Sequence, residues 1–293
     1  MANTTFTAAI FAKEVIRNLD RDVILLGHTD RGYEGEIKKG GDSVRVQTLP
    51  TLTFSSSAIV GAGDFANADI GTGPGGVIAA TDFTVSLENL VIDRFSNMRV
   101  TLTDHEMAQN VINIEAAVAK RFTQGLGIML DNRVRDQILV TQVADIPAAN
   151  KLDSGAPITL TTANVYSSIL ALRSALKKQN VLVKNMRLFV GVDAEALLLQ
   201  SSFLVGSGEA TSVLMNGNIG TVGGVPVFTT TALDASKEMI MMAEGSVNTA
   251  VQLLNTKTVE GTDGFYNNLL TEVVFGMKIF GENAKAIAIQ YVA

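Results

Sequence analysis

The chain has no cysteine, only two histidines and few charged residues, and each shortage excludes a class of site. Without cysteine there is no disulfide, no thiolate metal site and no cysteine nucleophile, a composition that fits assembly in a reducing cytoplasm. Lysine and arginine together number 23 against 29 aspartates and glutamates, and the net charge is −6. The chain therefore has no global basic signature for nucleic acid, and any contact with a polyanion must be local.

Long apolar runs are also absent, although the mean hydropathy is positive at +0.27. The run at 23–26 is far shorter than the span of about 18 apolar residues that a membrane helix needs. Residues 1–10 have no basic stretch before an apolar block, so we expect neither a secretory signal nor a membrane partner. A chain of 293 residues that is 47% hydrophobic and 18% charged is expected to be ordered and to bury apolar surface against copies of itself.

The most prominent feature that is present is a long predicted helix over residues 103–141. Thr103 and Glu106 have the spacing of a capping box, and Asp104 favours the positive end of the helix. At about 1.5 Å per residue the helix would be roughly 55 Å long, which indicates an elongated architecture rather than a compact enzyme core. Its apolar residues recur three or four positions apart and form one stripe: Met107, Val111, Ile114, Val118, Phe122, Leu126, Leu130, Val134 and Ile138.

A shorter amphipathic helix is predicted over residues 11–26, with Gly27 as its stop. Lys13, Arg17 and Arg21 recur at four-residue steps nearly opposite its apolar stripe, because an offset of two residues is a rotation of about 200°. Two interpretations stay open for these cations: a solvated face, or contact with a polyanion lying beneath this segment.

Glycine and serine dominate residues 55–80, which predicts an exposed loop of about 25 residues. A loop of that length is unusual in a self-contained domain unless it is functional or is ordered by a neighbour. Alternating patterns predict strands on both sides of this loop and further strands through the rest of the chain. Two helix patterns lie among them, at 165–176 and 193–199. The predicted strands are 43–48, 83–87, 98–102, 187–192, 225–228, 251–258, 272–280 and 286–292.

Candidates for chemistry fail on spacing. His105 lies between two acids, but consecutive helix residues diverge by about 100° and cannot converge on one metal ion. His28 is interpreted as a turn residue, and no Gly-x-Ser-x-Gly elbow supports a hydrolase. The glycine stretches 71–76 and 217–224 lack the strand and helix that a phosphate loop requires, and the methionines at 239–242 fit packing better than metal binding. We therefore predict no catalytic residue, no cofactor site and no metal site.

The order of these parts resembles the major capsid (coat) proteins of tailed bacteriophages, which have the Hong Kong 97-type fold. The resemblance covers nearly the whole chain, and the order of its motifs carries it more than any one motif does. The segments that carry it are the helical arm through Gly27, the strand entry 40–46, the loop end 100–104, the long helix with Asp131 near its end, the helix 165–176, the strand and helix 187–198, and the glycine turn 216–227.

The fold class that the resemblance implies is α+β, with an N-terminal arm, an extended β-hairpin loop, a peripheral domain carrying a long spine helix, and an α/β axial domain. The implied boundaries are 1–35 for the arm, 36–95 for the extended loop, 96–150 with 250–278 for the peripheral domain, and 151–249 with 279–293 for the axial domain.

The resemblance also implies a function. It is that of a major capsid protein, not an enzyme, whose hexamers and pentamers form the icosahedral head shell of a double-stranded DNA phage. Implied partners are further copies, a portal, DNA held by non-specific contact, and a scaffolding protein. Because no scaffolding-like segment precedes the arm, two alternatives stay open: a separate scaffolding protein is required, or the chain is a mature form. The implied location is the virion capsid, assembled in the host bacterial cytoplasm. Implied site residues are Lys13, Arg17 and Arg21 facing the lumen and DNA, and Glu36, Lys38, Lys39 and Arg45 in contacts between subunits.

Two alternative functions stay open. An encapsulin-like bacterial nanocompartment has the same fold but encloses a cargo enzyme, and an α/β enzyme could use a glycine-rich loop. Some relatives cross-link lysine to asparagine between subunits, for which Lys38 or Lys39 and Asn267 or Asn268 are the candidates here.

Overall fold

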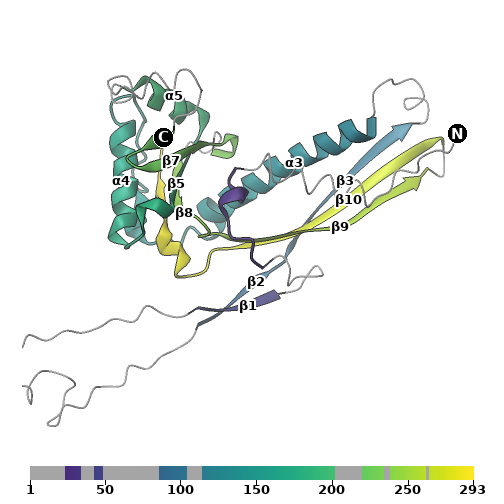
Figure 1. The fold of residues 1–293 in the computed structure, drawn as a ribbon, viewed down its shortest axis with the longest axis horizontal. Helices are drawn as coiled ribbons and strands as arrows, with labels where there is room; N and C mark the ends of the chain where they lie inside the picture. The colour runs from purple at the N-terminus through teal and green to yellow at the C-terminus, as the bar shows by residue number, and fades with distance from the viewer. Residues whose placement is uncertain are drawn as a thin grey trace, which may run out of the picture. The chain divides into compact units, whose positions relative to one another are not determined.

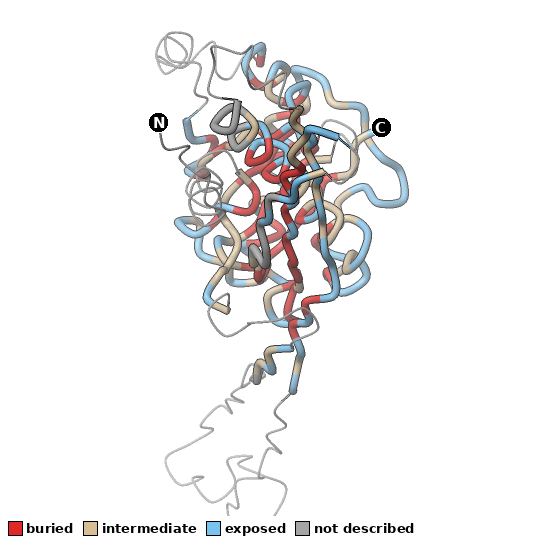
Figure 2. Tube along the Cα trace, turned by 90° about the vertical axis from the view of Figure 1, so that its right-hand side faces the viewer, coloured by how far each residue is buried: buried red, intermediate tan, exposed pale blue. Residues whose placement is uncertain are grey.

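The structure is a computed structural model that describes residues 24–33, 43–48, 86–103, 114–201, 220–233, 238–261 and 264–293. By contacts the chain divides into two compact units: Arg45–Glu88 forms one, and Met1–Val44 together with Asn89–Ala293 forms the other. The larger unit contains two sheets, and its buried residues follow the interior of the chain trace (Figure 2).

The first sheet of the larger unit is antiparallel and three-stranded. Its order is β3–β10–β9, with β10 in the middle. Exposure alternates along β3, as expected for a strand with one face buried. The long helix α3 lies along one face of this sheet (Figure 1). The bounds are Arg94–Thr103 for β3, Ile114–Asp136 for α3, Asn248–Glu260 for β9 and Tyr266–Lys278 for β10.

The predicted long helix is confirmed in its described part. After α3 the chain continues as a π-helical turn, η3 (Gln137–Thr141), so helical structure ends at the predicted position. The apolar stripe packs as predicted, since Phe122, Leu126, Leu130, Val134 and Ile138 all belong to one core cluster. Thr103 is the last residue of β3, and residues 104–113 lie outside the described part, so the proposed capping box stays a prediction.

The second sheet has six strands in the order β4–β11–β8–β5–β7–β6 and is mixed. Helices α4 and α5 confirm the two helices expected here, each within one or two residues. The bounds are Lys151–Leu152 (β4), Val165–Lys178 (α4), Met186–Val190 (β5), Val192–Gln200 (α5), Thr221–Val222 (β6), Val225–Thr229 (β7), Met239–Ala243 (β8) and Ile287–Gln290 (β11). Short 3-10 turns lie at Ala148–Asn150 (η4), Val183–Asn185 (η5), Thr231–Leu233 (η6) and Asn283–Ala286 (η7).

Both faces of the six-stranded sheet are buried, and its central strands divide their side chains between two cores. In β8, Met239 and Met241 pack with α4 and α5, whereas Ile240 and Met242 pack with α3. This follows from the two-residue period of a strand. The methionines are thus packing residues, as predicted, and the sheet is sandwiched between two sets of helices.

The smaller unit contributes most of a two-stranded sheet, β1 (Ser43–Thr48) with β2 (Ser86–Val91). The range of β1 is the predicted one. The strand expected at 83–87 corresponds to β2, which extends four residues further, and residues 83–85 lie outside the described part. Within the larger unit, the chain at Val91 and Ile92 lies so close to β10 that a Cβ on Gly276 would collide with the Val91 carbonyl oxygen.

The predicted stop at Gly27 is wrong. Gly27 lies inside a 3-10 turn, η1 (Leu26–His28), and its φ is not positive, so it is not the left-handed residue that ends a helix. The glycines with left-handed backbone include Gly223 and Gly224, with φ of 59° and 79° in the two-residue turn between β6 and β7. Such a turn needs positive φ at both positions, which explains that part of the 217–224 stretch.

Candidate functional site

The N-terminal segment, residues 24–33, is held against the long helix by Asp131. This side chain is 7% exposed; its Oδ2 accepts a hydrogen bond from the Ile24 backbone N–H at 3.2 Å, and its Oδ1 accepts one from Leu26 at 3.1 Å. Burial raises the pKa of the Asp131 carboxyl and outweighs the backbone hydrogen bonds, which lower it. Asp131 of α3 thus anchors residues 24–26 of the N-terminal segment on the long helix.

The same segment pairs with the turn between β8 and β9. Asp30 donates its N–H to the Val247 carbonyl at 2.8 Å and accepts from the Thr249 N–H at 2.9 Å, and Gly245 donates to the His28 carbonyl at 3.0 Å. These bonds continue the strand-like pairing recorded between Asp30 and Asn248. The N-terminal segment is therefore attached at the junction where β8 of one sheet leads into β9 of the other.

His28 is a turn residue, as predicted, and its ring lies among aromatic side chains. Its centroid is 4.4 Å from that of Phe228 and 5.4 Å from that of Phe189, and its buried Nδ1 has no hydrogen-bond partner among the described residues. Burial lowers the pKa of His28, opposed by the negative charge of Glu244 and reinforced by the positive charge of Arg187. Among the described residues, no hydrogen-bond partner orients the His28 ring as a general base would require.

A second junction between the sheets is closed by Gln142, just after η3. Its Oε1 accepts from the Ile279 N–H at 2.6 Å, and its Nε2 donates to the Ile279 carbonyl at 3.0 Å. The same Oε1 accepts from Gln137 at 2.7 Å, and the Nε2 also reaches Asp145 at 3.0 Å. The side chain therefore joins the end of the long helix to the end of β10 at the passage between the two sheets, where a π-turn interrupts α-helical bonding.

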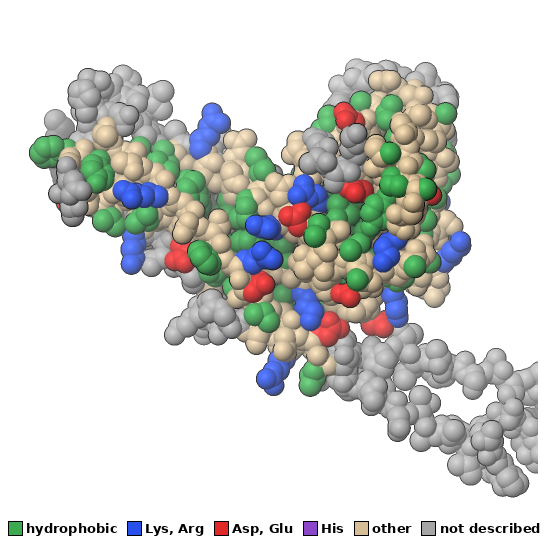
Figure 3. Space-filling model, turned by 180° about the vertical axis from the view of Figure 1, so that it is seen from behind, with side chains coloured by type: hydrophobic (Ala, Val, Ile, Leu, Met, Phe, Trp, Pro, Cys, Tyr) green, Lys and Arg blue, Asp and Glu red, His purple; other side chains and the backbone are tan. Residues whose placement is uncertain are grey.

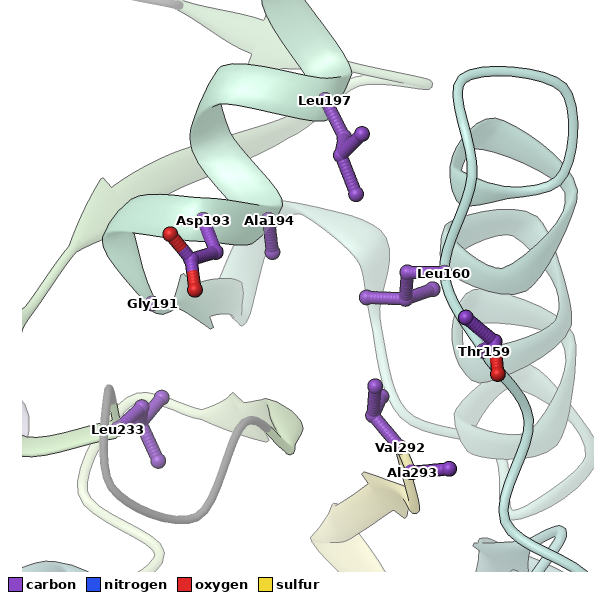
Figure 4. Close-up of a pocket in the computed structure, with 9 residues that line it drawn as sticks. All are labelled: Thr159, Leu160, Gly191, Asp193, Ala194, Leu197, Leu233, Val292 and Ala293. Carbon is purple, nitrogen blue, oxygen red and sulfur yellow. The ribbon is translucent and has the colours of Figure 1, made fainter.

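A hollow of about 190 Å³ opens at the start of α5 (Figure 4). Its lining is mainly aliphatic, with Asp193 as the one charged side chain, so it offers no set of groups for acid–base or nucleophilic chemistry. The lining residues are Thr159, Leu160, Gly191, Asp193, Ala194, Leu197, Leu233, Val292 and Ala293.

Charges of both signs are interspersed with apolar side chains on the face seen in Figure 3, without one continuous patch of either sign. Within the described ranges no three or more His, Cys, Asp or Glu side chains come together as a metal site. Over the same ranges no helix is long and apolar enough to cross a membrane.

Most sequence-predicted site residues lie outside the described part of the chain: Lys13, Arg17, Arg21, Glu36, Lys38 and Lys39. Arg45 is exposed in β1, within the smaller unit. Asn268, a cross-link candidate, is 6% exposed, and its Oδ1 accepts from Arg99 and Thr101, each at 2.9 Å. The sequence analysis named Asp131 but gave it no role. The available signal was an acid beside the apolar stripe of a helix, because a buried acid needs hydrogen-bond partners.

Comparison with known proteins gives one family. A family described as "Phage capsid protein" matches residues 88–288. No curated protein matches the sequence.

Solved structures with a similar fold come mainly from phages. A chain of Mycobacterium phage Che8 is 17% identical, with a TM-score of 0.71 over 91% of this chain and 90% of that one. The capsid of Cyanophage P-SCSP1u is 14% identical, with a TM-score of 0.66 over 91% and 86%. A virus-like particle from Pyrococcus furiosus is 15% identical, with a TM-score of 0.57 over 96% and 97%. At these identities the likeness shows the fold.

Proposed function

The chain belongs to the phage capsid protein family, and on that premise we propose that its hexamers and pentamers build the icosahedral head of a tailed, double-stranded DNA bacteriophage. The fold is the α+β Hong Kong 97-type fold, as predicted. The role of major capsid shell protein was also predicted and is confirmed by the family. The observation that carries the proposal is the family match over residues 88–288, which includes both sheets and the long helix.

Within this proposal each part of the chain has an assigned place. We assign residues 1–35 to an arm, 36–95 to an extended loop, 96–150 with 250–278 to a peripheral domain, and 151–249 with 279–293 to an axial domain. The three-stranded sheet with α3, and the six-stranded sheet with α4 and α5, support the last two assignments. The Asp131 contact bears on the first, because it anchors residues 24–26, which lie within the range assigned to the arm, on α3.

The finer partners belong to the same proposal. Lys13, Arg17 and Arg21 face packaged DNA, and Glu36, Lys38, Lys39 and Arg45 contact neighbouring subunits; assembly takes place in the host cytoplasm with a scaffolding protein and a portal. Neutralising the three arm cations is then expected to lower genome retention without reducing the number of shells, because phosphate contacts contribute non-specific affinity. An unchanged DNA content in that variant would remove these residues from the DNA contact.

Expression of the chain, alone and with a co-expressed scaffolding protein, tests the proposal directly. Electron microscopy and light scattering are expected to show closed shells in at least one condition. A monodisperse monomer in both conditions would overturn it.

The likeness to the Pyrococcus furiosus virus-like particle favours one second candidate, a nanocompartment shell on the same fold. Nuclease-protected DNA inside purified particles supports the phage head, and a stoichiometric enclosed protein in place of DNA supports the compartment.

A further inference from the structure

Residues 28–33 contact two of the places where the chain passes from one sheet to the other. Besides the backbone bonds to the turn after β8, the Thr29 hydroxyl lies 2.9 Å from that of Thr249, at the start of β9. At the end of β10, the Tyr33 ring makes an edge contact with Phe280, with 6.3 Å between the ring centroids. We name residues 28–33 the clasp, because they connect the passage from β8 to β9 with the chain that follows β10.

His28 is the residue through which the clasp contacts the six-stranded sheet. Its ring packs on Phe189 of β5 and Phe228 of β7, and these two rings stack on each other with their centroids 5.7 Å apart. Its Nδ1 is buried and has no hydrogen-bond partner among the described residues. In the charged form both nitrogens of the ring are donors. Protonation therefore places a buried N–H where none of the described residues accepts it, and this cost is relieved when the ring reaches water.

The charged groups around this ring do not offset the cost. Glu244, directly after β8, favours the charged ring and Arg187 of β5 disfavours it, and these two side chains form an ion pair of 2.6 Å with each other. No titratable side chain comes from β7, from β8 or from residues 248–252 of β9. The other titratable side chains of the clasp itself are Asp30, Arg31 and Tyr33. Burial is the largest influence, and it lowers the pKa of His28.

The two anchors of the N-terminal segment respond to pH in opposite directions. Burial raises the pKa of Asp131, so this carboxyl is protonated more readily while residues 24–26 lie on α3 than after their release. The His28 ring, with its lowered pKa, is protonated more readily after the clasp has left the sheet. The attachment at His28 therefore weakens as the pH falls below 6.5, and the attachment at Asp131 strengthens as the pH falls toward 3.8.

We propose that the clasp is an acid-released contact: in mild acid, residues 28–33 leave the junction between the two sheets while residues 24–26 stay bound to Asp131 of α3. Residues 28–33 lie at the end of the range assigned to the arm, directly before the range assigned to the extended loop, so the device makes the attachment of both depend on pH. All of these contacts lie within one chain. A failure of the clasp experiment therefore leaves the proposed function untouched, and a failure to form shells leaves the clasp untouched.

Hydrogen exchange of the unassembled full chain, followed by mass spectrometry between about pH 7.5 and about pH 5, tests the release. The reporters are the backbone N–H groups that join the clasp to the junction, those of Asp30, Gly245 and Thr249. After correction for the intrinsic exchange rate at each pH, their protection is expected to fall at least about fivefold toward acid, the lower end of what an unpaired buried donor costs. The N–H groups of Ile24 and Leu26, which bond to α3, are expected to keep their protection.

Two variants at the histidines identify the titrating group. His28→Gln removes the titrating ring and is expected to abolish the fall in protection. The matched control is His105→Gln, the same change at the other histidine of the chain, which is expected to behave as the wild-type chain does. Protection within α4 is expected to stay constant in all three proteins, which separates local release from global unfolding.

A reversible disulfide tests the same contact without altering His28. The Oγ1 atoms of Thr29 and Thr249 are 2.9 Å apart, so Thr29→Cys with Thr249→Cys brings two sulfur atoms within bonding reach in a chain that has no other cysteine. The oxidised variant is expected to keep the protection of the clasp at about pH 5, and the reduced variant is expected to lose it. Equal loss in both forms would contradict the release. If His28→Gln fails to fold, this comparison decides the question.

Three further results would overturn the inference. Equal protection of the clasp at both ends of the pH range shows that it is not released. An undiminished fall in His28→Gln places the origin of the pH dependence in another group, such as Glu244. Loss of protection in α4 at the same pH shows that the whole chain unfolds rather than the clasp alone.

Discussion

Replacing Gly276 by alanine tests the close approach of the backbone at Val91 and Ile92 to β10. A Cβ at this position would collide with the carbonyl oxygen of Val91 and would lie 2.9 Å from the Val91 carbonyl carbon and 3.1 Å from Cα of Ile92. All three atoms are backbone, so no side chain can rotate away. The φ of Gly276 is not left-handed, so alanine adds no torsional strain and the cost is steric.

The magnitude follows from these contacts. Overpacking a buried site costs about 1–3 kcal/mol, and because backbone on both sides must move we expect a value near the top of that range. Alanine recovers about 0.5–1 kcal/mol of strand entropy, leaving a net loss of about 2 kcal/mol. At an unfolding entropy of about 2.1 cal/mol/K per residue, that lowers the melting temperature of a chain of 293 residues by roughly 3 °C.

The assay is urea and thermal unfolding of the unassembled chain, with Gly125→Ala as the matched control. Gly125 lies in α3, and a Cβ there meets nothing within 4 Å. Alanine at Gly125 is therefore expected to stabilise the chain by about 0.5–1 kcal/mol through helix propensity. If Gly276→Ala unfolds at the wild-type midpoint with an unchanged slope, the tight crossing and the reasoning from it are refuted.

Three further substitutions test the sites that hold the segments together. Asp131→Ala leaves the buried N–H of Leu26 and the part-buried N–H of Ile24 unpaired and is expected to cost about 1–3 kcal/mol of unfolding free energy, whereas Asp93→Ala at an exposed position is expected to change little. Gln142→Ala removes both bonds to Ile279 and is expected to cost about 1–3 kcal/mol of unfolding free energy; a wild-type stability of this variant would contradict the role of the side chain. His28 has a lowered pKa, so the folded state binds a proton at this ring less readily than the unfolded state does. The neutral His28 ring therefore makes its full contribution to folding stability above pH 6.5, and this contribution is lost as the pH falls below 6.5 toward the lowered pKa. Comparing unfolding free energies across this pH range is expected to give a shallower dependence for His28→Gln, and an identical dependence would refute the assignment.

The raised pKa of Asp131 gives the opposite dependence of folding stability on pH. An acid whose pKa is higher in the folded chain stabilises it most when protonated, so its contribution falls as pH rises from 3.8 toward the raised value. Unfolding at acid pH is expected to show this slope in the wild-type chain and to lose it in Asp131→Asn. A slope that persists in the variant would place its origin elsewhere.

Local patterns in the sequence were enough to predict the elements with strong periodicity. The α3 stripe, α4, α5 and the strand pattern of β3 follow from periods of 3.6 and 2 residues, because burial on one face selects those spacings directly. Gly27 was assigned wrongly because a glycine after an apolar repeat has the same sequence signature whether it ends a helix or lies within a 3-10 turn.

Contacts between distant segments could not be predicted in this way. The register that aligns Arg99, Leu270 and Lys257 across three strands is not given by the sequence of each strand alone. The hydrogen bonds of Asp131 join residues 105 and 107 positions apart in the chain. Gly276 has no sequence signal for its role, because the atom that it must avoid belongs to a crossing segment far away in the chain.

The order of strands in the two sheets determines when each sheet can be completed during synthesis. β10 is the middle strand of one sheet and β11 an interior strand of the other, and each is synthesised after all the other strands of its sheet. Until they emerge, β3 and β9 lack the strand that lies between them, and β8 lacks its neighbour β11. Until β10 and β11 have been synthesised, neither sheet of the nascent chain is complete.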